Sequence, residues 1–326
     1  MQCAKRLTLC LVMLTLSFVI TMAQDTLRLV RANEAQAFPA VIPAGNYSGI
    51  CRIADNLYAL ADDKSATDGF HLVEIQIDSV QGNILSVAYR GFISTELPNR
   101  DAEGIAYNDS LQSLFVVGES DNSIAEYSLT GNLLRKSDDL CHILQFSENN
   151  LHNSGFESLT YNAVSRQFFT CTEAPLPSDT TIRIAALSPD FAPLSLWRYA
   201  LDVSSANQPM KIQAHGVSEL CSLRDGSLLV LERDACVPEE IFGAFVDAKI
   251  YQVFPNHSAP NSLLSKSLLW QTRTDISLFH QDFANYEGLC VGPTLIDGSQ
   301  VLILVADSQN RYGSVLQDWF LTLVVR

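Results

Sequence analysis

The sequence predicts an all-β fold, and within that class a β-propeller with five four-stranded blades. One observation is a motif that occurs five times, in which an acidic or hydroxyl residue, a short apolar strand, a polar turn and a second apolar strand follow one another. A second is the spacing of the motifs, which begin at residues 48, 103, 157, 218 and 287 and are therefore 55, 54, 61 and 69 residues apart. A third is that each interval contains about four strand-like runs, as the blades of propellers do.

Each motif is typical of a β-hairpin, because two short β-rich runs flank a turn rich in Asn, Asp, Ser or Gly. The five hairpins lie within residues 48–63, 101–121, 157–173, 218–234 and 287–307. The strands expected in the first two intervals are 49–53, 57–61, 70–77, 84–93, 104–107, 114–118, 123–129 and 132–135. Those expected in the next two are 159–161, 167–172, 182–187, 194–201, 220–223, 227–231, 248–254 and 268–272.

The last interval contains only three strand-like runs, at residues 288–291, 301–305 and 316–325. The segment TLRLVR at residues 26–31 precedes the first motif and can supply the missing strand. We therefore expect an N-terminal strand to close the ring. Six blades remain open if a long interval contains a degenerate blade, and a two-sheet sandwich or an open β-solenoid is the alternative architecture.

The N-terminal residues predict export. Lys5 and Arg6 precede an almost wholly apolar run at residues 7–22, and Thr21 and Ala23 are small residues at a suitable cleavage point. This pattern is typical of a secretory signal peptide at residues 1–23, followed by one propeller domain at residues 24–326. The expected location is secreted or periplasmic, and a retained membrane anchor is the alternative.

The charge of the chain narrows the choice of partners. The full sequence has 21 Lys and Arg against 36 Asp and Glu, a net charge of −15, and loss of two basic residues with the signal gives 19 − 36 = −17. Such a chain repels nucleic acid and anionic membranes, and its acids attract cations. No later stretch has the length and apolarity of a membrane span. We expect a monomer that takes a small ester or anionic molecule.

Six cysteines lie beyond the predicted signal. One repeat position carries small residues in all five motifs: Cys51, Ala106, Thr160, Cys221 and Cys290. We expect free buried thiols there, because a slot that accepts Ala, Thr or Cys is typical of a small core site. Cys141 and Cys236 lie in loop-like sequence and are the better candidates for a disulfide.

Two series of acids are expected to meet at one mouth of the propeller. The start of one strand and the end of the next lie at the same end of an antiparallel pair. The first series opens the first strands: Glu103, Glu157 and Glu287, with Ser48 and Ser218 in the matching positions. The second series closes the second strands: Asp62 or Asp63, Glu119, Glu173, Glu232 and Asp307, with Arg233 among them.

So many carboxylates repel one another unless cations compensate them or some are protonated. Clusters rich in oxygen suit calcium. The structural alternative is that each acid caps its own hairpin by accepting backbone N–H bonds. The sequence contains no G-x-S-x-G elbow, no H-E-x-x-H, no P-loop and no dinucleotide fingerprint.

With these motifs the chain resembles the family described as "esterase-like activity of phytase", a group of secreted bacterial propeller proteins. The resemblance extends from about residue 44 to residue 310. It is carried by SGI at 48–50 with ADD at 61–63, DAEGI at 101–105, GFESL at 155–159 with TE at 172–173, GVSEL at 216–220 with LERD at 231–234, and NYEGL at 285–289 with DSQN at 307–310. It implies a β-propeller and hydrolysis of phosphate or carboxylate esters. Propeller phytases, which look similar in architecture, use calcium held by acidic side chains.

The expected activity is therefore a metal-dependent ester hydrolase in which a metal-bound water attacks the ester. The expected calcium ligands are Glu103, Glu119, Glu157, Glu173, Glu287 and Asp307. Glu232 is expected as base or ligand, and Arg233 as a bidentate partner of the anionic oxygen. Further expected ligand-binding residues are Asp62, Asp63 and Asn310. The alternative is a non-catalytic propeller that binds a cation, a sugar or a protein.

Overall fold

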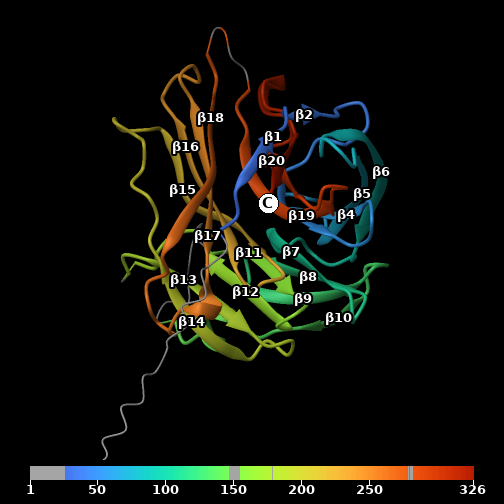
Figure 1. Cartoon of the computed structure of the whole chain (residues 1–326), viewed down its shortest axis with the longest axis vertical. Coiled ribbons are helices and arrows are strands. Elements are labelled where there is room, and N and C mark those ends of the chain that lie inside the picture. Colours follow the sequence, from blue (N-terminus) through green and yellow to red (C-terminus); the bar gives the residue numbers. More distant parts are fainter. Residues whose placement is uncertain (1–25, 147–154, 178, 278, 280–281) are drawn as a thin grey trace, which may run out of the picture.

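Five antiparallel sheets of consecutive strands lie around a common centre (Figure 1). The protein is described from a computed structural model, which covers residues 26–146, 155–177, 179–277, 279 and 282–326. Four sheets have four strands, and the fifth has a fifth short strand at its margin. The predicted five-bladed propeller is therefore confirmed.

The blades follow the chain in order. Blade 1 contains β3 (Tyr47–Arg52), β4 (Leu57–Asp62), β5 (Gly69–Ile77) and β6 (Ile84–Ser94). Blade 2 contains β7 (Ala102–Asn108), β8 (Ser113–Gly118), β9 (Ser123–Ser128) and β10 (Leu133–Lys136). Blade 3 contains β11 (Phe156–Asn162), β12 (Gln167–Thr172), β13 (Ile182–Leu187) and β14 (Pro193–Tyr199). Blade 4 contains β15 (Ile212–Ser222), β16 (Leu228–Val237), β17 (Phe245–Val253) and β18 (Lys266–Asp275).

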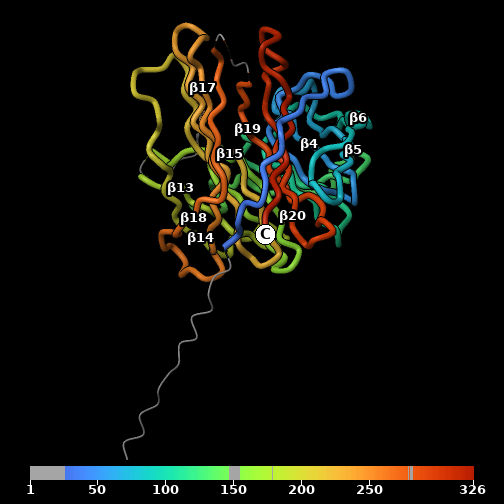
Figure 2. Tube along the Cα trace, turned by 45° about the horizontal axis from the view of Figure 1, so that its top comes forward, coloured from blue at the N-terminus to red at the C-terminus, as the bar shows by residue number. Residues whose placement is uncertain are grey.

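Blade 5 joins the two ends of the described chain. It contains β19 (Asn285–Thr294), β20 (Gln300–Asp307) and β21 (Trp319–Val325), and its fourth strand is β1 (Leu29–Ala32). β1 pairs antiparallel with β21, and the short β2 (Gln36–Ala37) pairs with the same strand. The blue segment that contains β1 runs beside the red C-terminal strands in both views (Figure 1 and Figure 2). The expected closure of the ring by an N-terminal strand is confirmed.

Hydrophobic contacts between neighbouring blades hold the ring together. Each of five hydrophobic clusters combines residues from two adjacent blades, so the set covers every interface of the ring. Phe70 of blade 1, for example, packs with Leu114 and Tyr127 of blade 2. Each blade is therefore buried on both faces, which explains why second strands such as β8 consist of continuous apolar runs rather than of alternating ones.

Helical structure in the described residues is brief. It comprises α1 (Leu140–Ile143) and the 3₁₀ turns η1 (Pro255–His257) and η2 (Tyr312–Ser314). None of the described helices has the length and apolar character that a membrane crossing requires. The predicted signal peptide at residues 1–23 lies outside the described residues.

All six cysteines beyond residue 23 are free and buried. The expectation of free thiols at Cys51, Cys221 and Cys290 is confirmed. The expectation of a disulfide at Cys141 or Cys236 is wrong, because neither residue lies in a loop. Cys141 belongs to the short helix α1 and packs in the cluster between blades 2 and 3, whereas Cys236 lies on β16 of blade 4.

Candidate functional site at the acidic mouth

The inner strand of every blade carries a β-bulge, where the register against the second strand shifts; it lies near the start of the strand in four blades and in the middle of β15 in blade 4. A bulge leaves its extra residue without a partner across the ladder and re-aims that side chain, which is why bulges are common beside active sites. The unpaired positions contain the first series of expected mouth residues. We call this set the bulge ring: Ser48, Glu103, Glu157, Ser218 and Glu287.

A second ring lies at the ends of the second strands in blades 1, 2, 3 and 5 and at the same level of β16 in blade 4, which continues to Val237. The last pairs before the bulges are Tyr47–Asp62, Ala102–Gly118, Phe156–Thr172, Val217–Glu232 and Tyr286–Ala306. The next residue along each second strand forms the strand-end ring: Asp63, Glu119, Glu173, Arg233 and Asp307. Four blades thus place a carboxylate at this level, and blade 4 places a guanidinium there.

The register separates Glu232 from the mouth. Successive side chains of a strand point to opposite faces, so the neighbour of Arg233 faces the other way. Glu232 is 3% exposed and accepts hydrogen bonds from Tyr199 Oη at 2.5 Å and from Lys266 Nζ at 2.6 Å. The expected catalytic pair is therefore split: Arg233 lies in the strand-end ring, and Glu232 lies in a polar network between blades 3 and 4.

The register also shows which of Asp62 and Asp63 belongs to the strand-end ring. Asp62 accepts a hydrogen bond from the backbone N–H of Lys64 at 3.1 Å, and its Oδ2 lies 3.3 Å from His71 Nε2. Asp63 occupies the strand-end ring, where its buried Oδ1 has no hydrogen-bond partner among the described residues. A buried carboxylate oxygen of this kind is able to accept a hydrogen bond or to ligate an ion.

Asn310, the third residue expected to bind ligand, lies in the turn after β20. Its Nδ2 donates to Asn46 Oδ1 at 2.7 Å, and its backbone N–H donates to the carbonyl of Gly45 at 3.1 Å. These contacts fasten the turn to the segment that leads into β3.

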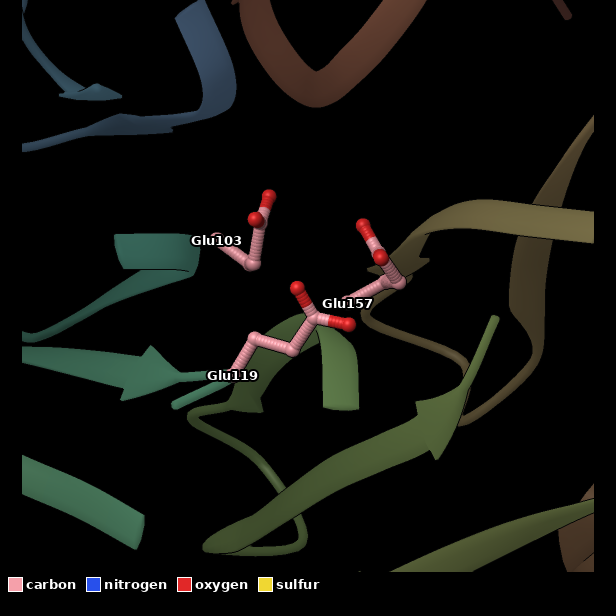
Figure 3. Close-up of side chains that lie close together, drawn as sticks. All are labelled: Glu103, Glu119 and Glu157. Carbon is pink, nitrogen blue, oxygen red and sulfur yellow. The ribbon is translucent and has the colours of Figure 1, made fainter. Parts of the chain in front are cut away.

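Three glutamates of the two rings form the tightest part of the site. Glu103, Glu119 and Glu157 each offer one carboxylate oxygen, and these three oxygens lie within 4.8 Å of one another. The side chains come from three separate backbone segments and meet in one space (Figure 3). Glu119 is fixed there, because its Oε1 accepts the backbone N–H of Gly155 at 2.9 Å. A Cβ at residue 155 would lie 2.4 Å from Glu119 Cγ, so glycine is needed for this approach.

Burial and mutual repulsion favour protonation of these acids. Burial, and then the charges of Glu157 and Glu287, raise the pKa of Glu103 well above its ordinary value. Burial, and then Glu173, do the same for the pKa of Glu157. Burial raises the pKa of Glu287 to about 7, against the opposing effect of Arg233. Burial and the charge of Glu287 raise the pKa of Asp307 to about 8. The raised pKa values therefore favour protonated carboxyl groups in the mouth at neutral pH. A cation that binds there can replace these protons.

Arg233 gives the mouth a basic side. Its Nη2 donates to Glu173 Oε1 at 2.9 Å, and its Nη1 donates to Glu287 and, at 3.3 Å, to Asn285 Oδ1. The guanidinium is thus held between blades 3 and 5, and its buried Nε has no hydrogen-bond partner among the described residues. The glutamate trio and Arg233 all belong to the bulge ring or the strand-end ring. The trio comes from blades 2 and 3, and Arg233 comes from blade 4.

Asn285 was not predicted from the sequence as a residue of the site. Its Nδ2 donates to Glu287 Oε1 at 2.7 Å while its Oδ1 accepts from Arg233. The only available signal was its position at the start of NYEGL, where its backbone pairs with Asp307.

The donor set fits a calcium ion. All three ligands of the trio are carboxylate oxygens, and calcium takes six to eight oxygens at about 2.3–2.6 Å, so adjacent ligand oxygens within 4.8 Å of one another suit one ion. The strand-end and bulge rings offer further carboxylates close by, at Glu173, Glu287 and Asp307. A site made only of carboxylates favours calcium, magnesium or manganese over softer metals.

Solved structures share only a distant likeness with this chain. A streptogramin B lyase is 12% identical, with 90% of this chain and 98% of that chain covered and a TM-score of 0.39. A structural genomics protein of unknown function from Bacteroides thetaiotaomicron is 9% identical, with 90% and 72% covered and a TM-score of 0.43. Hydrazine synthase of Kuenenia stuttgartiensis is 7% identical, with 83% of this chain covered and a TM-score of 0.40, and the chain spans 59% of its length. These likenesses carry no argument about the reaction.

The comparison with curated proteins found no significant match. A protein-family model gives a clear result, because it matches residues 42–309, which is most of the chain and includes both rings. The chain therefore belongs to the phytase-like family described as "esterase-like activity of phytase".

Proposed function

We propose that the protein is a calcium-dependent hydrolase that cleaves phosphate or carboxylate esters at the acidic mouth. One observation carries the proposal: a trio of carboxylates suited to a divalent cation, with Glu103 and Glu157 buried and Glu119 half-buried, shares the two rings with a single guanidinium suited to an anion. Membership of the phytase-like family supports the same class of reaction.

The glutamate trio is the centre of the proposed metal site. The oxygens of Glu103, Glu119 and Glu157 would hold the ion, and Glu173, Glu287 and Asp307 would supply further ligands. A bound calcium ion would polarise an ester oxygen and lower the pKa of water. Ligation also removes the mutual repulsion of the carboxylates, which burial makes costly.

Arg233 is the proposed anchor of the substrate. A planar guanidinium binds phosphate or carboxylate oxygens through parallel N–H bonds. Its partners, Glu173 and Glu287, are also candidate ligands of the ion, so the guanidinium would be available to a substrate when their oxygens bind the ion. Glu232 has no part in this proposal, because its carboxylate is occupied by Tyr199 and Lys266.

Export forms part of the proposal. A cleaved signal at residues 1–23 delivers the enzyme to a secreted or periplasmic location. Extracellular calcium modules function with dissociation constants of about 10⁻⁴–10⁻³ M. A site of that modest affinity is sufficient there, and a small soluble ester is the expected substrate.

The test is hydrolysis of p-nitrophenyl phosphate and p-nitrophenyl acetate by the mature protein, with calcium and with chelator. We expect turnover that chelator abolishes, a loss of about 100-fold or more in Glu119→Gln, and a comparable loss in Arg233→Met. Glu239→Gln is the matched control, because this glutamate is exposed and belongs to neither ring. Turnover that persists in chelator, or none at all from the wild type with calcium, would contradict the proposal.

A second candidate is a propeller that binds a cation without catalysis. The observation that favours it is the pairing of Arg233 with two carboxylates, which leaves only Nε unsatisfied. In that case calcium raises the melting temperature of the wild type and neither ester is hydrolysed.

A further inference from the structure

The channel of the propeller continues below the mouth and changes its chemical character there. A cavity of about 140 Å³ is lined by three consecutive residues from each of the five inner strands. The middle residue of each triplet is the small residue of the repeat: Cys51, Ala106, Thr160, Cys221 and Cys290. This level contains thiols, whereas the mouth contains carboxylates together with Arg233 and Asn285.

The three thiols come from adjacent blades. Cys221 belongs to blade 4, Cys290 to blade 5 and Cys51 to blade 1, and blade 5 lies between the other two because the ring is closed. All three side chains are buried. Burial, and then the proximity of Cys221 and Cys51, raise the pKa of Cys290, as expected if the three sulfur atoms share one sector of the channel.

Glu219 is an unexpected residue in the same channel. It directly follows the bulge of blade 4, at a level where blades 1, 2 and 5 have Gly49, Gly104 and Gly288. Glycine is required where inner strands approach closely, since a Cβ on Gly104 would lie 2.1 Å from the backbone nitrogen of Leu159. Blade 4 places a long acidic side chain at this constricted level.

The carboxylate of Glu219 is only half satisfied. The residue is 1% exposed, and its Oε1 accepts the backbone N–H of Leu220 at 2.9 Å. Its buried Oε2 has no hydrogen-bond partner among the described residues. Burial, and then the charge of Glu219, raise the pKa of the thiols of Cys51 and Cys221. The half-satisfied carboxylate is therefore an electrostatic neighbour of the thiols and is buried, as they are.

We propose that this channel is a second metal site, which binds a thiophilic divalent cation of the zinc class through Cys51, Cys221, Cys290 and Glu219. Three thiolates and one carboxylate are a donor set for zinc and cadmium, in contrast to the hard oxygens of the mouth. Each thiol that ligates the ion would lose its proton to solvent, and Glu219 would do the same, because burial raises the pKa of this carboxyl well above its ordinary value.

Binding requires a local rearrangement. Among the described residues, the mouth trio is the group whose ligand atoms already lie within 4.8 Å of one another. The channel ligands must therefore turn inward about their side-chain torsions. The cavity of about 140 Å³ that is lined by the three cysteines provides room for their movement.

The experiment is a titration of the reduced, metal-free full chain with Cd²⁺ in excess Ca²⁺, which saturates hard-oxygen sites. We expect an ultraviolet thiolate-to-cadmium charge-transfer band that saturates at about one ion per chain. Cys290→Ser should abolish most of the band. Glu219→Gln, which preserves shape, should weaken cadmium binding by about tenfold or more.

Cys236→Ser is the matched control, because Cys236 is a buried thiol outside the channel, and it should leave the band unchanged. Glu119→Gln should also retain the band, so failure of the calcium proposal would not be mistaken for failure of this one. No band in the wild type, or a band that survives Cys290→Ser, overturns the proposal. So does equal cadmium affinity in Glu219→Gln and the wild type. Circular dichroism of each variant verifies that it is folded.

Discussion

At the scale of the residue, Arg233 accounts for how so many buried acids coexist. It occupies the one strand-end position without a carboxylate and contacts Glu173 of blade 3 and Glu287 of blade 5. All three side chains are nearly buried, so the charges are poorly screened by solvent. Removal of the guanidinium leaves two buried carboxylates without their common partner.

We therefore expect Arg233→Met to destabilise the calcium-free protein by about 3–5 kcal/mol, the usual cost of breaking a buried ion pair from one side. Urea unfolding in chelator measures this. Lys211→Met is the matched control, because Lys211 is exposed and its pair with Glu239 is long, at 3.6 Å, so the cost should stay below about 1 kcal/mol. Equal effects of the two substitutions would show that Arg233 does not stabilise the mouth.

The raised pKa values also predict a pH dependence. Glu287 has a pKa of about 7 in the folded protein and an ordinary value of 4.5, and Asp307 has about 8 against 3.8. The folded state therefore binds more protons than the unfolded state between these limits, and stability falls as the pH rises. In chelator the melting temperature should decrease from pH 5 to pH 8, and saturating calcium should flatten this slope. A Glu287→Gln, Asp307→Asn variant should also flatten it, and a wild-type melting temperature that rises with pH in chelator would contradict the assignment.

At the scale of the element, the bulge in each inner strand limits which residues of the site can be predicted from the sequence. The two acidic series were predicted to meet at one mouth, because hairpin ends are visible as repeats. The register between the inner and second strands was harder to predict, because a shift of one residue moves a side chain to the opposite face of the sheet. Asp62 and Glu232 looked equivalent to the strand-end acids, yet Asp63 and Arg233 occupy those positions. The position of Glu219 in the channel could not be predicted from the sequence, because it depends on contacts between blades.

Two glycines of these strands give a matched test of close approach. Gly104→Ala would place a Cβ 2.1 Å from a backbone atom of the next blade, whereas Gly155→Ala would only displace the side chain of Glu119. We expect Gly104→Ala to destabilise the fold by about 3 kcal/mol or more, because backbone must move. Gly155→Ala should remain near wild-type stability but bind calcium more weakly. Thermal melts with and without calcium compare them, and similar stability of the two variants would disprove this view of the inner strands.

At the scale of the whole molecule, closure of the propeller by β1 keeps the bulge ring and the strand-end ring in place. β1 supplies the outer strand of blade 5, so the edge of β21 is covered by the other end of the chain. The repeat count predicted this closure, because the last interval lacked a strand. An uncovered β21 would be an exposed edge, which promotes aggregation.

A chain that starts at residue 33 should therefore melt several degrees lower than one that starts at residue 26 and should aggregate on heating. The longer chain is the control, because it retains β1 and its pairing with β21. Calorimetry and light scattering measure both effects. Identical melting curves would mean that β1 does not contribute to the closed ring.

The central claim is that the mouth binds calcium through the trio of Glu103, Glu119 and Glu157. Titration calorimetry of the mature protein with Ca²⁺ near pH 7, in two buffers of different ionisation enthalpy, tests it most directly. The account predicts binding that releases protons, because the ion replaces protons held by acids of raised pKa. It also predicts loss of this binding in Glu119→Gln and retention in Glu239→Gln. Absence of calcium binding in the wild type, or equal binding in Glu119→Gln, would contradict the claim.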